Sequence, residues 1–566
     1  MKKLYLPLLL LILSQITVAQ TPTLKWAIQT GGPDADEAYS ITTDANGNVY
    51  TTGYFRGTVD FDPGAGTFYL KSSLLMDIYI QKLDSSGNFL WAKQMGGKAN
   101  DFGSSISTDD KGNIYTIGWF GGTIDFDPGA GITNLVSSGH SDIFIQKLDS
   151  AGNLLWVKQM GGNGIDYGLS ISIDAKGNIY TTGDFTDTVD FNPGVGYDYL
   201  ISSGEDDIFI QKLDSSGKFL WVKQMGGASY DRGYSITTDV GSNVYTTGYF
   251  SGTTDFDPGV GTVNLTAAGQ YDVFIQKLDS AGNFLWARKF GGNAADIGLS
   301  VITDIHGNVY MTGSFNDTIN LVHGSVNINL ASAGGKDIFI QKLDPAGNFL
   351  WIKHMGGSSH DGGCSITTDN KGNIYTTGYF SGTTDFDPGA GTVNLTAVGT
   401  YDIYVQKLDS TGSYIWAIQM AGSQWDRGRS LTIDIKGNIY TTGYFSGTAD
   451  FDPGVGISNL TSEGNRDIFI QKISQYISTI GIIENYFGDE FNFYPNPTSC
   501  IVTIELGKTY QEIGMTVRNT LGQVVLTKTY KSPNQLNFEI KGSSGVYFVE
   551  IWTTEGNSAI MKIVKE

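Results

Sequence analysis

Residues Asp142–Gln159 read DIFIQKLDSAGNLLWVKQ. Two runs in this stretch, Asp142–Leu148 and Asn153–Gln159, are rich in Ile, Phe, Leu and Trp, which is typical of β-strands. Asp149–Gly152 lies between them and combines an aspartate that can bond the turn backbone with a glycine that can adopt the left-handed conformation. The stretch therefore predicts a tight antiparallel hairpin.

A second hairpin of the same kind precedes it. Ser105–Thr108 and Asn113–Phe120 (NIYTIGWF) are its predicted strands, because both are bounded by polar turn residues and are rich in Ile, Thr and Tyr. Asp109–Gly112 forms the turn between them. Residues 105–159 therefore form one unit of four antiparallel strands.

This unit recurs seven times with a constant period of 65 residues. A tyrosine in a phrase of the type G-N-x-Y-T-T-G marks the second strand of every copy, at Tyr50, Tyr115, Tyr180, Tyr245, Tyr310, Tyr375 and Tyr440. A tryptophan marks every copy of the fourth strand, at Trp26, Trp91, Trp156, Trp221, Trp286, Trp351 and Trp416. Seven repeats of four strands predict an all-β, seven-bladed β-propeller. We expect the aromatic columns to pack between blades rather than to stack on a cofactor, because such rings supply much of a core.

The order of strands at the two ends of the repeat region predicts how the ring closes. The chain begins with a fourth strand, Thr23–Gln29, and the last unit ends with a third strand, Asp467–Ile473. The N-terminal strand can therefore complete the last blade, which leaves no unpaired join in the ring.

The phrase G-N-x-Y-T-T-G followed by D-I-F-I-Q-K-L-D-x-x-G-N-F-L-W resembles the repeat of bacterial seven-bladed β-propellers. The resemblance covers about residues 22–474, and we predict a propeller domain over residues 20–474. That family is defined by its fold, so the resemblance implies an architecture rather than an activity.

The N-terminal segment predicts export from the cytoplasm. Met1–Lys3 is basic, Leu4–Leu13 is apolar apart from one proline, and Ala19 follows small residues. This pattern is typical of a secretory signal peptide over residues 1–19, cleaved after Ala19 to leave Gln20 as the new N-terminus. The apolar run is too short to span a bilayer, and we predict no transmembrane segment.

The repeat stops after Ile473, and the sequence predicts a linker over residues 475–490 and a small immunoglobulin-like β-sandwich over residues 491–566. Its motifs Tyr494–Pro497, Gly545–Phe548 and Lys562–Lys565 resemble the type IX secretion C-terminal sorting domain of Bacteroidetes. The resemblance implies the secretion machinery as a partner, and passage from the periplasm to the medium or the outer cell surface. An ordinary immunoglobulin-like binding domain is the alternative.

Charge and composition argue against several classes of protein. The 566 residues contain 36 basic and 57 acidic side chains, a net charge of −21, which disfavours nucleic acids and anionic membranes as partners. Cys364 and Cys500 form neither a disulfide framework nor a metal-ligand spacing. We find no sequence motif of a hydrolase triad, a phosphate loop or a dinucleotide site. We therefore predict a monomeric protein that is not an enzyme.

Aspartates of the repeats stand in columns that begin at Asp36, Asp44, Asp60, Asp62, Asp77 and Asp84. Most of them are expected to cap turns, because the short carboxylate bonds nearby backbone N–H groups. The fourth-to-first and second-to-third connections open on the same face of a propeller. The columns of Asp36, Asp60, Asp62 and Asp77 therefore predict an acidic face.

The long second-to-third connection carries the phrase Asp-Phe-Asp-Pro-Gly, for which two interpretations stand. The Pro-Gly pair indicates a tight turn, whereas paired carboxylates suit Ca²⁺. The full spacing of a calcium loop is absent, so we predict no metal or other cofactor, with Ca²⁺ as the alternative. The predicted binding residues are the aspartates of five copies: Asp60, Asp62, Asp125, Asp127, Asp255, Asp257, Asp385, Asp387, Asp450 and Asp452.

These observations predict a non-catalytic binding or scaffold protein for a glycan, a protein or a surface polymer. The alternatives are a secreted polysaccharide-active hydrolase or lyase and a structural surface-layer component. An enzyme would need unlike residues near the axis. The residues that break the repeat in the fourth-to-first connections are Glu37, Arg232, His360, Trp425 and Arg427.

Overall fold

The computed structural model describes residues 22–566 except 324–325, 455, 476–481, 486, 488–490, 495–497, 499–500, 520–522, 554–557 and 566. The predicted cleavage residues Ala19 and Gln20 lie outside this range. The chain divides into two compact units, one ending at Gln475 and the other covering Tyr476–Glu566. Within the described residues we find no apolar helix of membrane-spanning length.

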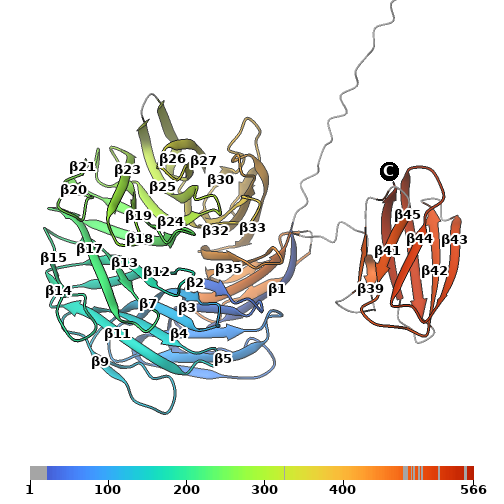
Figure 1. Cartoon of the computed structure of the whole chain (residues 1–566), viewed down its shortest axis with the longest axis horizontal. Coiled ribbons are helices and arrows are strands. Elements are labelled where there is room, and N and C mark those ends of the chain that lie inside the picture. The colour runs from blue at the N-terminus through green and yellow to red at the C-terminus, as the bar shows by residue number, and fades with distance from the viewer. Residues whose placement is uncertain are drawn as a thin grey trace, which may run out of the picture. The chain divides into compact units, whose positions relative to one another are not determined.

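The first unit is a ring of seven blades, each built on four antiparallel strands, as the sequence predicts (Figure 1). The innermost strand of every blade contacts the innermost strands of both neighbouring blades, so the ring closes around a central axis. Predicted and observed strands agree closely. In blade two the third strand has the predicted bounds, Asp142–Leu148, and the first strand begins three residues earlier than predicted, at Phe102.

From the axis outward, blade one consists of β2 (Glu37–Thr43), β3 (Val49–Asp60), β4 (Tyr69–Leu83) and β5 (Phe89–Met95), and blade two of β6 (Phe102–Thr108), β7 (Ile114–Phe120), β10 (Asp142–Leu148) and β11 (Leu154–Gly162). Blade three consists of β12 (Asp166–Ile173), β13 (Ile179–Phe185), β16 (Asp207–Leu213) and β17 (Phe219–Gly227), and blade four of β18 (Asp231–Thr238), β19 (Val244–Phe250), β22 (Asp272–Leu278) and β23 (Phe284–Gly292). Blade five consists of β24 (Ile297–Thr303), β25 (Val309–His323), β26 (Val326–Leu343) and β27 (Phe349–Gly357), and blade six of β28 (Gly362–Thr368), β29 (Ile374–Phe380), β32 (Asp402–Leu408) and β33 (Tyr414–Gly422). Blade seven consists of β34 (Arg427–Ile433), β35 (Asn438–Phe445), β38 (Asp467–Ser474) and β1 (Thr23–Thr30).

The ring closes through the N-terminal strand, which confirms the prediction. β1 pairs antiparallel with β38, from Thr23 opposite Ser474 to Thr30 opposite Ile468. The Gln29 amide donates to Asp467 Oδ2 at 2.7 Å, the same bond that the fourth strands of other blades make. Blade seven is therefore completed by residues from both ends of the propeller.

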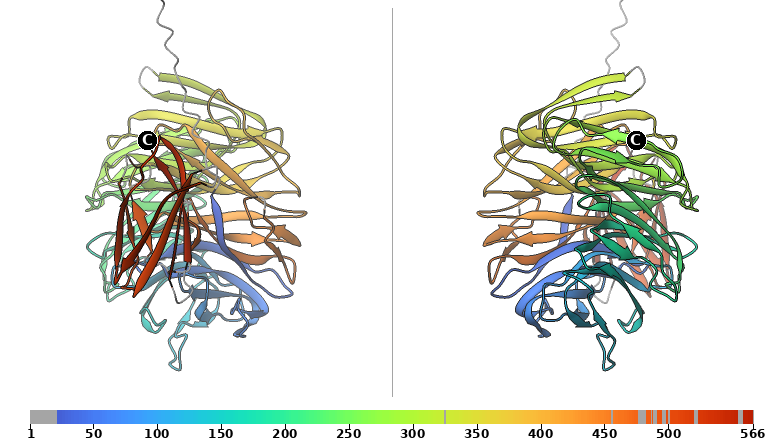
Figure 2. Two further views of the ribbon diagram at one scale, coloured as in Figure 1. Left: turned by 90° about the vertical axis from the view of Figure 1, so that its right-hand side faces the viewer. Right: turned by 90° about the vertical axis from the view of Figure 1, so that its left-hand side faces the viewer.

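A small hairpin in the second-to-third connection covers the outer edge of the preceding blade. The separate hairpins are β8 (Thr123–Asp125) with β9 (Asn134–Val136), β14 (Thr188–Asp190) with β15 (Tyr199–Ile201), β20 (Thr253–Asp255) with β21 (Asn264–Thr266), β30 (Thr383–Asp385) with β31 (Asn394–Thr396), and β36 (Thr448–Asp450) with β37 (Asn459–Thr461). In blade three, Asp190 pairs with Gly161 of the blade-two outer strand. In blade five the hairpin continues β25 and β26, which reach outward from the ring (Figure 2). Such pairing protects outer strands that would otherwise present free backbone groups.

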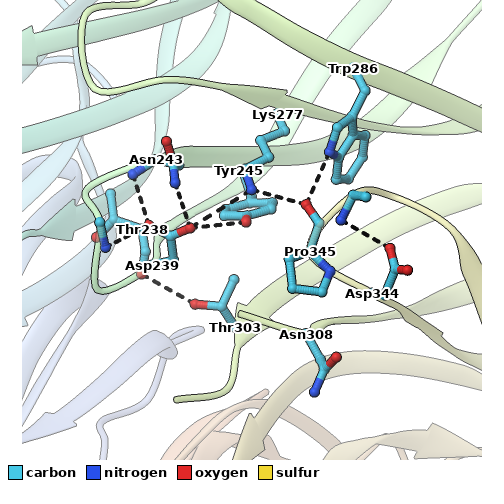
Figure 3. A network of polar contacts seen from close by, with 12 residues as sticks. Thr238, Asp239, Asn243, Tyr245, Lys277, Trp286, Thr303, Asn308, Asp344 and Pro345 are labelled. Carbon is cyan, nitrogen blue, oxygen red and sulfur yellow. Dashed lines mark hydrogen bonds and ion pairs between the residues drawn. The ribbon is translucent and has the colours of Figure 1, made fainter. Parts of the chain in front are cut away.

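A lysine joins each blade to the next on the face of the first-to-second turns, as Figure 3 shows for blades four and five. Lys277 Nζ donates to the Pro345 carbonyl at 3.0 Å, and Trp286 Nε1 donates to the same oxygen at 3.3 Å. Lys277 lies 4.8 Å from the ring centroid of Tyr245, whose hydroxyl donates to Asp239 at 3.0 Å. The aromatic columns thus pack between blades, as predicted.

The same type of lysine and tryptophan contact joins blade seven to blade one at the ring seam, where the two ends of the propeller meet. Lys472 Nζ and Trp26 Nε1 both donate to the Ser85 carbonyl of blade one, at 2.7 Å and 3.3 Å. Blade seven has no third-to-fourth turn to receive Lys407, and Lys407 donates instead to the Gln475 side chain at 2.6 Å. The seam is therefore fastened by residues on both sides of the missing turn.

The second unit is a sandwich of two antiparallel sheets. One sheet consists of β39 (Ile482–Asn485), β46 (Ser558–Lys565), β45 (Gly545–Thr553), β42 (Glu512–Asn519) and β43 (Val524–Lys531), and the other of β40 (Asn492–Tyr494), β41 (Ile501–Glu505) and β44 (Gln535–Glu539). β39 lies in the segment predicted as a linker and pairs with β46. The sequence did not reveal β42, whose apolar alternation is interrupted by Gly514 beneath the Trp552 ring.

Candidate functional site

The ten aspartates predicted as binding residues bond to the backbone of their own hairpins. Asp60 Oδ1 accepts hydrogen bonds from the N–H groups of Asp62 at 3.0 Å and Phe68 at 2.7 Å. Asp62 Oδ1 accepts one from Gly64 at 2.8 Å. The same bonds recur at Asp125, Asp127, Asp255, Asp257, Asp385, Asp387, Asp450 and Asp452. These contacts favour the turn interpretation, and a binding role for these residues stays a prediction.

The phenylalanine of the repeated phrase anchors each hairpin. Phe61 is fully buried and contacts the rings of Phe55 and Tyr79 at centroid distances of 5.3 and 5.1 Å. Its carbonyl accepts a hydrogen bond from the Gln81 amide at 2.7 Å. The phrase therefore places one apolar ring in the core between two aspartates that cap the turn.

Added Ca²⁺ is expected to leave the thermal stability unchanged. No cluster of three or more His, Cys, Asp or Glu side chains in the described part of the chain could hold a metal ion, whereas Ca²⁺ takes about six to eight oxygen ligands. The measurement is melting in millimolar Ca²⁺ against a chelator at matched ionic strength, which keeps screening equal. A rise of several degrees, lost in Asp60→Asn/Asp62→Asn, would contradict this expectation. Blade five has Asn320 in place of the first aspartate and is a natural copy without the phrase.

The predicted acidic face carries less charge than the sequence suggests, because the columns of Asp36 and Asp77 are buried. Both residues and all their copies have an exposed fraction of 0%. Asp36 accepts hydrogen bonds from the N–H groups of Gly32 and Arg56, each at 2.9 Å. Burial raises the pKa of Asp36 to about 7. These two columns are structural parts of the blade junctions, and the expectation that they form a charged surface is wrong.

An open cavity of about 300 Å³ lies at the axis and is lined by residues from all seven blades. Seven of its lining residues occupy one position of the repeat: Tyr39, Ser104, Leu169, Tyr234, Leu299, Cys364 and Arg429. These residues differ from blade to blade, whereas the tyrosine at the Tyr50 position is the same in every copy. The residues that build the blades are therefore nearly the same in every copy, whereas the residues that line the axis vary between copies.

Blades one and two contribute aromatic rings to this axial cavity. Phe102 and Trp119 are stacked with centroids 4.3 Å apart, and Tyr54 meets Phe102 edge-on at 4.8 Å. The Tyr39 ring centroid lies 6.3 Å from that of Phe102 and 5.8 Å from that of Tyr54. The rings present flat apolar surface beside polar edges, an arrangement common in ligand pockets.

Blade seven contributes three arginines to the same end of the axis. Glu37 Oε1 lies 2.5 Å from Arg466 Nη1, and Glu37 Oε2 lies 3.4 Å from Arg429 Nη2. Burial opposes the charge on Arg429 and is the largest single effect, but Glu37 and other neighbouring groups together raise the pKa of Arg429 above its ordinary value. Arg427 lies over the rings of Tyr379 and Tyr401, 4.1 and 5.1 Å from their centroids.

A second charged group lies on blades three and four. Arg232 Nε is 2.9 Å from Asp184 Oδ1, and Arg232 Nη2 is 3.3 Å from Asp206 Oδ2. Burial raises the pKa of Asp184 to about 7, although the Arg232 charge acts in the opposite direction. The two charged groups have different compositions, so the mouth of the axis has no sevenfold symmetry.

The structure places three of the five residues predicted from the broken symmetry in separate contacts. Glu37 pairs with Arg429 and Arg466, Arg427 lies over Tyr379 and Tyr401, and Arg232 pairs with Asp184 and Asp206. Trp425 is 43% exposed and contacts Tyr401, and His360 Nδ1 accepts a hydrogen bond from the Lys336 N–H at 3.1 Å. Sequence reasoning missed Tyr39, Tyr54, Phe102, Trp119, Asp184, Asp206, Tyr379, Tyr401, Arg429 and Arg466. Aligning the seven copies and seeking the positions that vary most would have found these residues.

The first unit is a β-propeller with an open cavity at its axis. A β-propeller repeat family matches residues 25–54, 90–119, 155–184 and 415–451. A secretion system C-terminal sorting domain matches residues 492–566. The chain thus carries propeller repeats followed by a type IX sorting domain, which directs export to the medium or the outer cell surface.

Similar proteins of known sequence or structure add little about activity. An uncharacterised WD repeat-containing protein of Acanthamoeba polyphaga mimivirus is 24% identical over 76% of this chain and 36% of its own length. The regulatory protein FlaEY of Caulobacter vibrioides is 23% identical over 52% of this chain and 28% of its own length. The chain thus spans about a third of the length of these relatives. An exotype rhamnogalacturonan lyase structure is 12% identical over 94% of this chain and 91% of its own, with a TM-score of 0.20, too low for any inference.

Proposed function

We propose that the protein is an exported, non-catalytic binding protein whose glycan ligand enters the axial cavity. The observation that carries the proposal is the variation of residues at the axis within otherwise nearly uniform blades. The Tyr39 position holds five different residue types in seven blades, although the same strands keep their buried residues alike. A propeller that served only as a scaffold would have no need of this variation.

The chemistry of the cavity supports recognition of a glycan. Phe102 and Trp119 offer apolar faces, and the arginines and tyrosines beside them offer hydrogen-bond donors, as small-molecule sites commonly do. Glu37 and Asp184 both form ion pairs with arginines. Side chains that are held in place in this way suit the role of orienting a ligand. The axial cavity fits this role better than the hairpin aspartates, which bond their own turns.

The test is a glycan and polysaccharide binding screen on the mature full-length protein, followed by titration of the best ligand. Trp119→Ala is expected to weaken binding at least tenfold, because a stacked ring is lost from the cavity wall. Phe68→Ala is the matched control, since Phe68 is an aromatic residue on an outer hairpin with 38% exposure. Melting of each variant checks that it is folded. Loss of binding in Asp60→Asn/Asp62→Asn but not in Trp119→Ala would place the site on the hairpins instead.

One observation favours a polysaccharide hydrolase or lyase as the second candidate. Asp184 is buried at the mouth, and its pKa is raised to about 7, a property of carboxylic acids that transfer protons near neutral pH. Time-dependent release of shorter fragments from a bound polysaccharide, abolished in Asp184→Asn, would establish this candidate. Binding without fragment release supports the first proposal.

A further inference from the structure

We propose that the ligand of the axial cavity ends in an acidic sugar unit whose carboxylate is bound by Arg427 and Arg429. This inference rests on the proposed function and names the ligand class for the same cavity. The carboxylate would meet the guanidinium groups on blade seven, and the face of the sugar ring would meet the aromatic wall of blades one and two.

The first argument is an excess of positive charge on one side of the mouth. Arg429 and Arg466 of blade seven both lie over the Tyr444 ring, and Arg427 is two residues before Arg429 on β34. Of the described carboxylates, only Glu37 forms ion pairs with these three arginines. Both oxygens of Glu37 are already used, one by Arg466 and one by Arg429. The three arginines and Glu37 therefore carry an excess of positive charge, in a protein whose net charge is −21.

Arg427 is held in place without a carboxylate partner. Its guanidinium group lies over two tyrosine rings, forms no ion pair with any described residue, and has a buried Nε without a hydrogen-bond partner. A Cβ atom on residue 362 would lie 2.7 Å from Tyr379 Cζ, so Gly362 leaves the space that the Tyr379 ring occupies. A planar guanidinium group suits a carboxylate in both shape and charge, and that of Arg427 has no carboxylate partner among the described residues.

The shape of the cavity favours a sugar ring over a peptide. Its volume of about 300 Å³ is at the low end for small-molecule pockets, which suits one ring rather than a longer segment. Extended peptides are commonly bound along grooves or sheet edges, and a cavity enclosed by seven innermost strands offers neither. The stacked Phe102 and Trp119 rings give the C–H face of a pyranose a flat surface to contact.

The experiment is calorimetric titration of the mature full-length protein with uronate oligosaccharides. The panel contains oligomers of galacturonate, glucuronate and mannuronate, each paired with its methyl ester, which removes the charge and keeps the ring. At least one uronate is expected to bind ten times more tightly than its ester. Arg427→Gln is expected to remove this preference, and Arg427→Lys to restore part of it. Arg56→Gln is the control, because Arg56 is an exposed arginine of the second-to-third connection.

Equal affinity for uronates and their esters, or no binding of any uronate, would overturn the inference. So would unchanged selectivity in folded Arg427→Gln, or tighter binding of a peptide with a free C-terminal carboxylate. The wild-type comparison of acid and ester does not depend on any variant being folded. Binding of neutral glycans that is lost in Trp119→Ala but kept in Arg427→Gln would retain the proposed function and reject only the acidic ligand.

Discussion

A protein that lacks residues 22–30 is expected to melt at a temperature lower by about 10 °C or more. The deletion removes β1 from blade seven and leaves the edge of β38 unpaired. It also removes the Trp26 side chain from the seam and leaves the buried Asp467 without its bond to Gln29. Differential scanning calorimetry of the truncated and full proteins measures the effect.

Variants within the strand separate its side-chain contribution from that of its backbone. Trp26→Ala is expected to cost about 2–4 kcal/mol, in the range of large-to-small changes at packed aromatic residues. Lys25→Ala is the control in the same strand, because Lys25 is exposed and should change stability by less than about 0.5 kcal/mol. A synthetic peptide of residues 22–31 should restore stability by pairing with the free edge. Unchanged melting of the truncated protein would show that the ring does not depend on β1.

The propeller is expected to be most stable in mildly acidic solution and to lose stability as the pH rises from about 4 to 7. The cause is a column of seven buried carboxyls at the blade junctions, each fully buried. Burial is the main cause that raises the pKa of each of these carboxyls to about 6 or 7, and the charge of a neighbouring aspartate raises it further. The seven residues are Asp36, Asp101, Asp166, Asp231, Asp296, Asp361 and Asp426.

The sign of the effect follows from proton binding. An unfolded aspartate has a pKa near 3.8, so between about pH 4 and pH 7 the folded protein binds more protons than the unfolded chain. The free energy of unfolding therefore falls as the pH rises through this window. Turn aspartates such as Asp109 affect the free energy of unfolding below this pH window. Burial alone would raise the pKa of Asp109, but bonds from Asn113, Tyr115 and backbone N–H groups lower it overall, so that its contribution is lost as the pH falls below about 4.

The expected size is large because seven junctions act together. With about 1 kcal/mol from each carboxyl, the melting temperature should drop by roughly 10 °C between pH 5 and pH 8. Asp101→Asn should reduce the slope by about one seventh, since its amide stays uncharged and can donate to Asp77, whose Oδ1 is buried without a partner. A melting temperature that is flat or rises between pH 5 and pH 8 would contradict the expectation.

The blades were predictable from sequence because their physics is local and repeated. A strand such as Asp142–Leu148 is defined by its own composition and by turns on either side. Closure through β1 followed from counting strands at both ends of the repeat. The small hairpins were not predicted as strands, because three-residue pairs such as β14 and β15 gain their stability from the phenylalanine between them and from the preceding blade.

The axial cavity was only partly predictable, because its residues meet across blades. Glu37 and Arg466 are far apart in the sequence, and no local pattern joins them. The burial of the Asp36 and Asp77 columns was missed for a related reason. A turn aspartate and a junction aspartate look alike in sequence, and only the packing of two blades decides which of them is removed from water.

The seam between β1 and β38 also has consequences for the order of events during export. Thr30 pairs with Ile468, whereas the strands within a blade pair over a few tens of residues, and the entropic cost of closing a loop grows with its length. We expect the seam to form last, after the whole propeller has been synthesised. The sorting domain follows the residues that complete the ring. A chain broken off within the propeller keeps β1 but lacks β38, the strand that β1 must pair with, and it lacks the sorting domain as well. We therefore expect only complete chains to be delivered outside the cell.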